Sequence, residues 1–163
     1  MDKSCDLEKT MNEVYLKFKL NFYRNLFRNG EFGKEKLTVM ENFCAEAIYA
    51  LKGPNINELA EFIQVSQPNA AYKVNNLVKK GYIKKIPSTI DKRQVHLYVT
   101  DKFKEHYSVN YNYIHGIIHR LEGSIDQEHL ETFCDVLEIM ENGLMTEVSK
   151  DMDSMYLDSK KEK

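Results

Sequence analysis

The residues most able to do chemistry are three cysteines and five histidines, and their spacing argues against a metal or redox centre. Cys5, Cys44 and Cys134 form no Cys-x-x-Cys pair and cannot all be bridged in one chain, so we expect neither a disulfide framework nor a structural zinc site. His115 and His119, four residues apart on one predicted helix, could share a metal, but two ligands do not make a site. We predict no metal.

Catalytic signatures do not stand out either. We find no Ser/His/Asp arrangement, no glycine-rich phosphate loop and no paired-carboxylate signature, so we predict that the chain is not an enzyme and needs no cofactor. Cys44 and Cys134 each stand next to a phenylalanine, which indicates buried, inert thiols. Cys5 lies near the N-terminus and could oxidise between chains, although its two acidic neighbours disfavour a thiolate.

The overall charge hides an uneven distribution along the chain. The 163 residues include 23 Lys+Arg and 25 Asp+Glu, a net charge of -2 that speaks against a polyanionic partner. Residues 55–100, however, hold seven basic and three acidic residues, whereas residues 101–163 hold seven basic and fourteen acidic ones. A basic middle beside an acidic end is a hint of a nucleic-acid-binding element, although a chance solvated surface gives the same pattern.

No segment has the apolar length of a signal peptide or a membrane span. We therefore expect a cytoplasmic protein with no membrane partner. The length fits one domain with appended helices.

The middle of the chain predicts a helix-turn-helix followed by a two-stranded hairpin. Thr38 can cap a helix that ends at Lys52-Gly53-Pro54, and a short helix with Leu59 and Ala60 inward follows it. Ser66 is placed to cap the next helix, over residues 67–80. Residues 82–86 and 94–99 then alternate as two strands around a charged tip. A hairpin directly after a helix-turn-helix makes a wing.

Long amphipathic helices flank this unit. The helix over residues 7–27 is apolar on two faces, so it needs two partners to pack against. A long helix begins near Asp101, Gly123 interrupts it, and a last helix carries one apolar stripe to Val148. We predict a mainly α (α+β) fold, a winged helix-turn-helix with long N- and C-terminal helices. Its predicted parts are an N-terminal helix (1–30), a winged helix-turn-helix (37–100), further helices (101–148) and a charged, flexible tail (149–163).

These motifs resemble the MarR family of winged-helix transcription regulators over about residues 37–103. The resemblance rests on an ordered set of motifs: Leu59-Ala60, Val65-Ser66-Gln67-Pro68, Leu77-Val78-Lys79-Lys80-Gly81-Tyr82-Ile83, Asp91-Lys92-Arg93 and Val99-Thr100. It implies a homodimer whose N- and C-terminal dimerisation helices (1–30 and 101–148) interleave. It also implies that the winged helix-turn-helix (37–100) is the DNA-binding domain and that the two recognition helices bind a pseudo-palindromic DNA operator. It also implies a regulator, most simply a repressor, that a small molecule or oxidant releases from DNA.

The resemblance, together with the residue types, assigns the DNA contacts. We expect Gln67, Asn69, Tyr72 and Asn76 to read bases, and Ser66, Lys73, Lys79, Lys84 and Lys85 to contact the backbone. In the wing, Asp91, Lys92 and Arg93 form the tip, with Arg93 at the minor groove and Asp91 orienting it. Members of the family commonly carry Arg or Lys where this chain has Tyr72 and Asn76. We therefore predict an A·T-rich or methyl-rich site.

The effector pocket should lie between the dimerisation helices and the winged helix. Tyr15, Phe18, Phe22 and Phe43 could line it and take a small aromatic or lipophilic effector, although such aromatic stripes are also typical of plain core. Two alternative functions stay open. One is a winged-helix dimer used for protein–protein contact, which the weakly basic recognition helix favours, and the other is a redox- or zinc-responsive regulator.

Overall fold

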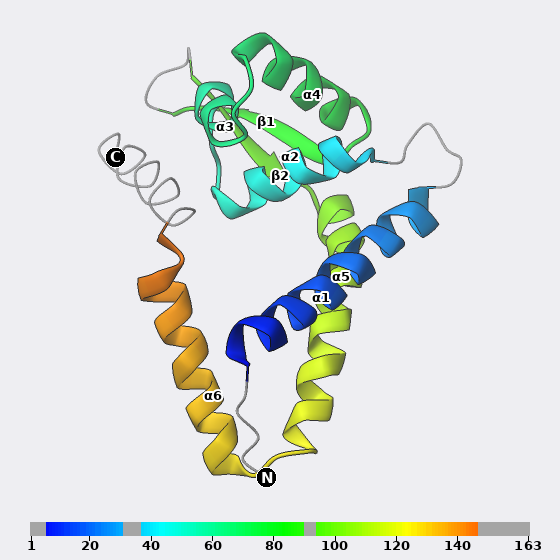
Figure 1. Ribbon diagram of the computed structural model, residues 1–163. Helices are drawn as coiled ribbons and strands as arrows, with labels where there is room; N and C mark the ends of the chain where they lie inside the picture. Colours follow the sequence, from blue (N-terminus) through cyan, green and yellow to red (C-terminus); the bar gives the residue numbers. More distant parts are fainter. Residues whose placement is uncertain (1–5, 31–36, 90–93, 147–163) are drawn as a thin grey trace.

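The computed structural model describes residues 6–30, 37–89 and 94–146, and its helical content confirms the predicted fold class. A compact winged helix sits above a pair of splayed arms built from the long helices (Figure 1). The elements in chain order are α1 (Leu7–Gly30), α2 (Val39–Ala50), α3 (Ile56–Phe62), α4 (Gln67–Lys79), β1 (Ile83–Pro87), β2 (Val95–Val99), α5 (Asp101–Glu122), α6 (Gln127–Ile139) and a π-helical turn, η1 (Met140–Leu144).

Two capping boxes fix where α2 and α3 begin. The Glu41 backbone N–H donates to Thr38 Oγ1 over 3.2 Å, and the Thr38 N–H donates to Glu41 Oε2 over 2.8 Å. Asn55 and Glu58 exchange the same two bonds at the start of α3, over 3.0 and 2.7 Å. Each box satisfies backbone donors that a helix N-terminus leaves without an intrahelical partner. The predicted cap at Thr38 is therefore confirmed.

The hydrophobic core lies inside the winged helix. The inward face of α4 is buried as predicted, and Val74 and Leu77 are fully buried in it. Phe103, near the start of α5, is fully buried in the same cluster. The first turn of α5 is therefore part of the winged-helix core, and Tyr107 in the next turn packs against it. The main core residues are Leu37, Cys44, Ala45, Ala47, Ile48, Leu59, Val74, Leu77, Tyr82, Ile83, Leu97 and Phe103.

The predicted hairpin forms an antiparallel sheet in which Ile83 pairs with Val99 and Lys85 with Leu97. Because side chains alternate between the two faces of a strand, Ile83 and Lys85 lie on one face of β1 and Lys84 on the other. The Leu97 N–H donates to the Pro54 carbonyl over 2.9 Å, which ties β2 to the segment before α3. The predicted wing-tip residues Asp91, Lys92 and Arg93 lie outside the described residues.

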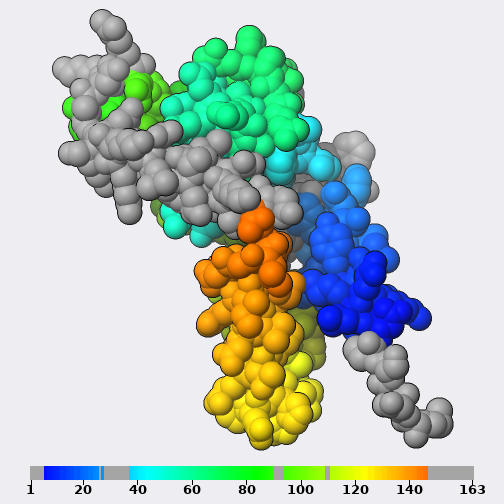
Figure 2. Space-filling model, turned by 60° about the vertical axis from the view of Figure 1, so that its left-hand side comes forward, coloured from blue at the N-terminus to red at the C-terminus, as the bar shows by residue number. Residues whose placement is uncertain are grey.

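The two arms differ in how well their own chain covers them. The α1 arm contacts α5, and Phe18 meets Tyr113 edge to face with ring centroids 5.9 Å apart. In contrast, α6 has no buried residue at all. Figure 2 shows α6 (yellow to orange) standing out below the winged helix. Among the described residues, no helix combines the length and apolar character needed to cross a membrane.

The last helix differs from its prediction in two respects. Cys134 is exposed, because none of the residues of α6 is buried by the described part of the chain. The last helix was also predicted to carry one continuous stripe to Val148, which lies outside the described residues. The α-helical hydrogen bonding is interrupted after Ile139 by a π-helical turn, closed by a 3.0 Å bond from the Met145 N–H to the Met140 carbonyl. The turn contains Asn142 and Gly143, both weak helix formers, and the Asn142 side chain donates to the Glu138 carbonyl over 3.0 Å.

A long-range ion pair joins α2 to the end of α4. Lys80 Nζ lies 2.7 Å from Glu41 Oε2, and the two side chains are 20% and 9% exposed. Burial on its own raises the pKa of Glu41, but the hydrogen bonds from Lys80 and Thr38 outweigh it and leave the pKa below its ordinary value. A lowered carboxyl pKa stabilises the fold above the unfolded-state pKa, and the contribution is lost as pH falls through the folded-state pKa.

We predict that Glu41→Ala lowers the free energy of unfolding by about 2–3 kcal/mol at neutral pH, because it removes both the ion pair and the capping bond. Glu41→Gln keeps an acceptor for the capping box and should cost about half as much. Urea unfolding across a pH series measures both. The stability difference between the parent and Glu41→Gln should shrink as the pH is lowered. Equal stability of all three proteins at neutral pH would contradict the assignment.

Candidate nucleic-acid interface

A tight turn sets the angle at which α4 is presented. Gln64 adopts a left-handed conformation with φ of 53°, and the Val65 N–H donates to the Ala60 carbonyl over 3.0 Å. Ser66 then takes the N-cap position of α4, as predicted, but its side chain makes no capping hydrogen bond. Pro68 occupies the first turn, where a missing N–H costs least. The start of α4 thus projects from the winged helix with the Ser66 side chain exposed.

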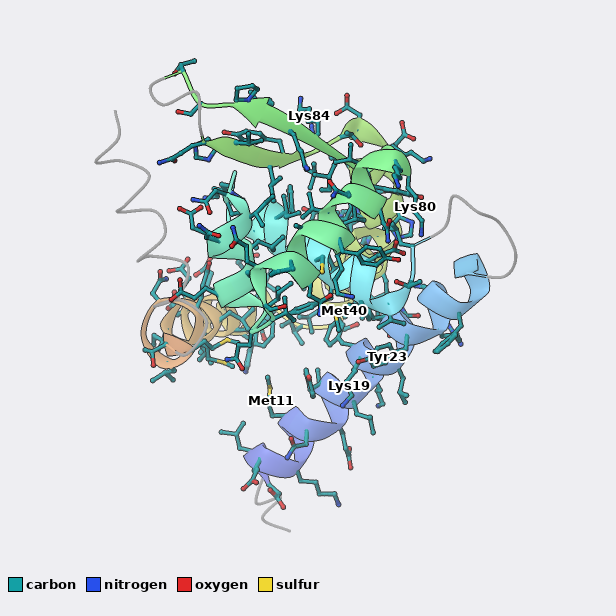
Figure 3. All side chains as sticks on the ribbon, turned by 90° about the horizontal axis from the view of Figure 1, so that it is seen from above. Met11, Lys19, Tyr23, Met40, Lys80 and Lys84 are labelled. Carbon is teal, nitrogen blue, oxygen red and sulfur yellow. The ribbon has the colours of Figure 1, made fainter. Side chains whose placement is uncertain are left out.

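The outward face of α4 is polar and accessible at most of the predicted positions. Gln67, Asn69 and Tyr72 are exposed, and Tyr72 keeps 66% of its surface. Asn76 is half-buried. Lys73 is also half-buried. Burial raises the pKa of the Cys44 thiol, and the charge of Lys73 partly offsets this rise. Lys73 is therefore close enough to α2 to act on a core thiol. Figure 3 looks down onto α4 and the two strands.

The two wing lysines have different surroundings. Lys85 Nζ donates to Asn75 Oδ1 over 2.7 Å, so β1 is tied to the exposed side of α4. Lys84, on the opposite face of β1, is exposed. Asp101 has a lowered pKa, chiefly through its hydrogen bond from Lys104, and the charge of Lys84 adds a smaller effect. Lys85 therefore joins the wing to α4, whereas Lys84 lies toward the start of α5.

A polar hollow of about 310 Å³ lies where α3, α4 and β2 meet. Gln67 lines it, together with Asn57 and Gln94, two amides that sequence reasoning did not assign to the interface. Asn57 lies in the first turn of α3 and Gln94 directly precedes β2. Their polar neighbours in the sequence were the signal that could have pointed to them. Amide side chains carry both donors and acceptors, as hydrogen bonding to bases, sugars and phosphates requires.

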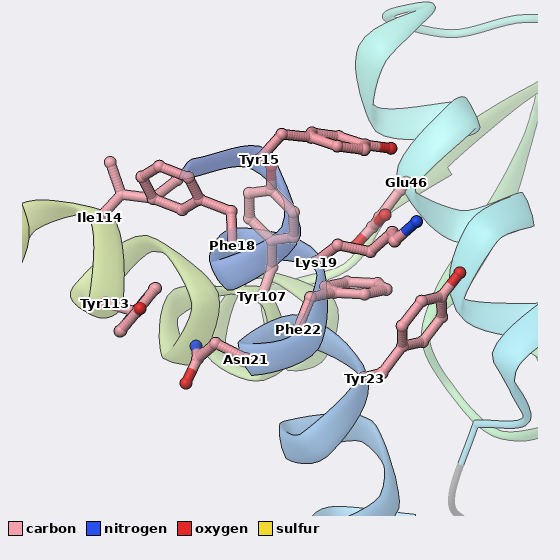
Figure 4. A pocket seen from close by; sticks show the side chains of 10 residues that line it. All are labelled: Tyr15, Phe18, Lys19, Asn21, Phe22, Tyr23, Glu46, Tyr107, Tyr113 and Ile114. Carbon is pink, nitrogen blue, oxygen red and sulfur yellow. The ribbon is translucent and has the colours of Figure 1, made fainter. Parts of the chain in front are cut away.

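A second hollow, the aromatic pocket, lies between α1, α5 and α2 and has a volume of about 390 Å³ (Figure 4). Three of the residues predicted for an effector pocket, Tyr15, Phe18 and Phe22, line it. The fourth, Phe43, is not among its lining residues and is 45% exposed. The remaining lining residues are Lys19, Asn21, Tyr23, Glu46, Tyr107, Tyr113 and Ile114.

A buried polar chain that sequence reasoning missed runs from this pocket to α5. The fully buried Asn42 donates from Nδ2 to Glu46 Oε1 over 2.9 Å. His106 Nε2 lies 3.0 Å from Asn42 Oδ1, a carbonyl oxygen that only accepts, so Nε2 carries the proton. Burial raises the pKa of Glu46 and lowers the pKa of His106. The amide thus holds a carboxyl group on one side and a neutral imidazole on the other.

The histidines and cysteines proposed for sensing are not brought together. Within the described ranges, no group of three or more His, Cys, Asp or Glu side chains could hold a metal ion. His115 and His119 are both exposed on α5. Cys5 lies outside the described residues.

Residues 44–95 match the model of the MarR family. The fold is similar to FabT of Streptococcus pneumoniae in complex with DNA, with a TM-score of 0.59 and 16% identity over 86% of this chain and 99% of that one. It is also similar to the transcriptional regulator Tm0710 of Thermotoga maritima, with a TM-score of 0.63 and 19% identity over 87% of this chain and 96% of that one. A third similar structure is a MepR mutant of S. aureus bound to an oligodeoxyribonucleotide, with a TM-score of 0.55 and 16% identity over 84% of this chain and 96% of that one.

No curated protein sequence matches the chain significantly. At these identities the solved structures establish the fold: a winged helix between long terminal helices. The family match covers α4 and most of the winged helix, so this part of the chain is similar to the MarR family in sequence, and the whole chain has the same fold as the solved structures above.

Gly53 allows the wing to pack close to the end of α2. Its φ is +108°, and a Cβ there would lie 2.8 Å from the Tyr98 ring. The Gly53 carbonyl also accepts a 2.8 Å hydrogen bond from His96 Nδ1, which anchors β2. Only glycine combines this backbone conformation with this approach.

We predict that Gly53→Ala destabilises the protein by about 2–3 kcal/mol, because it strains the backbone and displaces Tyr98. Gly143→Ala is the matched control, since a Cβ there meets nothing within 4 Å and its φ is not positive. Thermal unfolding of the three proteins measures the difference. If Gly53→Ala unfolded at the temperature of the parent, the close approach would be wrong.

Proposed function

We propose that this chain is a DNA-binding transcription regulator that inserts α4 into the major groove of an operator. The observation that carries the proposal is the exposed, amide-rich face of α4, projecting at the top of the winged helix beside a lysine-bearing wing. An α-helix fits the major groove, and amide side chains can form bidentate hydrogen bonds with adenine. Gln67, Asn69 and Tyr72 are exposed on this face, since Val74 and Leu77 hold α4 from the opposite side.

Sequence is read by exposed side chains near the start of α4. Gln67, Asn69 and Tyr72 are accessible, and Asn76 is half-accessible one turn beyond Tyr72. Asn and Gln suit adenine, and the Tyr72 ring can contact thymine methyl groups. This set favours an A·T-rich or methyl-rich site.

Backbone contacts come from the lysines around this face. Lys79 and Lys84 are exposed and can reach phosphates, with Ser66 at the helix start. Lys73 and Lys85 add positive charge while they also support α4 from α2 and β1. In the wing, we assign Lys92 and Arg93 to DNA and Asp91 to orienting Arg93, on the sequence alone. Residues 55–100 hold seven basic and three acidic residues, a modest excess, so we expect tight DNA binding to need two subunits. Because the lysines contact phosphates, the affinity for DNA should fall steeply as the salt concentration rises.

The second subunit would cover the exposed apolar stripe that runs along α6 and into η1, here called the α6 stripe. Val136, Leu137 and Leu144 are 46%, 42% and 66% exposed in one chain. α1 likewise leaves Leu16, Leu20 and Phe27 exposed. Two copies related by a two-fold axis would bury these rows and place two α4 helices about 34 Å apart, one turn of DNA. Residues 1–30 and 101–148 would then be the dimerisation segments and 37–100 the DNA-binding unit.

We assign the homodimer a repressor role, in which it blocks promoter access and releases DNA when a small aromatic or lipophilic molecule enters the aromatic pocket. The pocket supports this assignment by its position, because it touches α1 and α5 of the arms and α2 of the winged helix. An occupant there would change the angle between arms and winged helix. That angle sets the spacing of the two α4 helices.

We predict that selection from random DNA enriches a pseudo-palindromic, A·T-rich site. Tyr72→Ala and Asn69→Ala should each weaken binding to this site by about tenfold to a hundredfold and relax the sequence preference, because each removes a base contact worth about 1–3 kcal/mol. Asn112→Ala, an exposed amide on α5, is the matched control and should bind as the parent does. Titration of a fluorescent duplex at two salt concentrations measures these affinities.

The same titration separates the alternative of a winged helix used for protein contact. That function predicts weak binding to all duplexes and no enriched site. A selected site with G·C pairs at the recognition-helix positions would contradict the assigned base readers while leaving DNA binding intact.

A further inference from the structure

We propose that Glu46 makes the aromatic pocket selective for organic monocations, small aromatic ligands that carry one positive charge. The inference rests on the proposed function only in giving such a ligand the role of effector. Binding itself is a property of the pocket and needs no DNA.

The pocket has the size and surface of a small-molecule site. Its volume of about 390 Å³ falls within the range of ligand sites in proteins. Six of its ten lining residues are aromatic: Tyr15, Phe18, Phe22, Tyr23, Tyr107 and Tyr113. Aromatic rings present a negative face, which attracts a cation within about 6 Å of the ring centroid. Such a lining suits a ligand that is both flat and positively charged.

One of these rings already holds a cation. Lys19 Nζ lies 5.2 Å from the centroid of the Tyr15 ring, and both residues line the pocket. In Figure 4 the Lys19 and Glu46 side chains reach into the same side of the pocket. The lysine thus occupies a position where a ligand's positive charge would be favourable.

The side chains of Lys19 and Glu46 differ in how firmly their surroundings fix their positions. Lys19 is exposed and stands on a long flexible stem, so it can turn into solvent at little cost. Glu46 is half-buried, and its Oε1 accepts from Asn42, whose own orientation is fixed by His106 and by complete burial. The negative charge is therefore the fixed feature of the pocket and the positive charge the replaceable one.

Burial strengthens this preference. The half-buried carboxyl group has a raised pKa, which means that its charge is poorly solvated where it stands. A cation placed beside it compensates that charge, whereas an anion adds repulsion and a neutral ring leaves the charge unpaired. Glu46 also touches Asn42, so a ligand at this carboxylate is one hydrogen bond from the α2–α5 contact at His106.

The test is calorimetric titration of the full chain with three probes of similar shape: 1-methylquinolinium, a cation; quinoline, uncharged at neutral pH; and 1-naphthoate, an anion. We expect the parent to bind the cation at least about tenfold more tightly than quinoline, with the anion weakest. In Glu46→Gln, which keeps the shape and an acceptor for Asn42, the cation should lose that advantage while quinoline binds as before.

Glu105→Gln is the matched control, because it removes an exposed carboxylate on α5 that does not line the pocket, and it should keep the cation preference. Thermal unfolding checks that both variants fold. Tightest binding of naphthoate, a cation preference that survives Glu46→Gln, or no binding of any probe would overturn the proposal. Titration of the same samples with a DNA duplex separates ligand binding by the pocket from DNA binding by the winged helix. Cation binding without DNA binding would contradict the proposed function and leave this inference standing.

Discussion

The apolar stripe on α6 is the constraint on which the rest of the molecule depends. Phe133, Val136 and Leu137 lie along a helix that its own chain leaves without a single buried residue. Burying one large apolar side chain contributes about 1.5–3 kcal/mol, so a row of them in water is a large unfavourable surface. A second copy offers the same row in return, and a two-fold axis would let each cover the other. In the proposed dimer, this contact holds two winged helices at a fixed separation.

α5 is the element that links this contact to the DNA-binding unit. At one end Phe103 is fully buried in the winged-helix core, and at the other Gly123 leads into α6. His106 joins the same helix to α2 through Asn42, one turn from Phe103. The aromatic pocket lies along this stretch, with Tyr107 and Glu46 in its wall. In the proposed release mechanism, an occupant of the pocket would therefore act at the joint between arm and winged helix.

Sequence patterns predicted the features of the fold that depend on neighbouring residues. The capping box at Thr38, the buried face of α4 and the wing strands all follow from short-range spacing. They could be predicted because caps and amphipathic periods are decided within one or two turns.

Features that depend on distant residues could not be predicted in this way. Cys134 has an apolar neighbour, but the described part of the chain buries no residue of its helix, so the thiol is exposed. Phe43 stands on α2 next to a buried cysteine, yet it is 45% exposed and does not line the aromatic pocket. In the hydrogen-bonded series Glu46–Asn42–His106, Asn42 and His106 are 64 residues apart in the sequence. No local sequence pattern indicates such a contact.

The central claim is that α6 requires a second copy of the chain, and the most direct test is the mass of the protein in solution. Light scattering at micromolar concentration should give twice the mass of one chain for the parent. Leu137→Glu places a charge in the α6 stripe and should give the mass of one chain, with the winged-helix core still folded, because Leu137 is not part of it. A parent that has the mass of a single chain, or a Leu137→Glu protein that stays at twice that mass, would contradict the account.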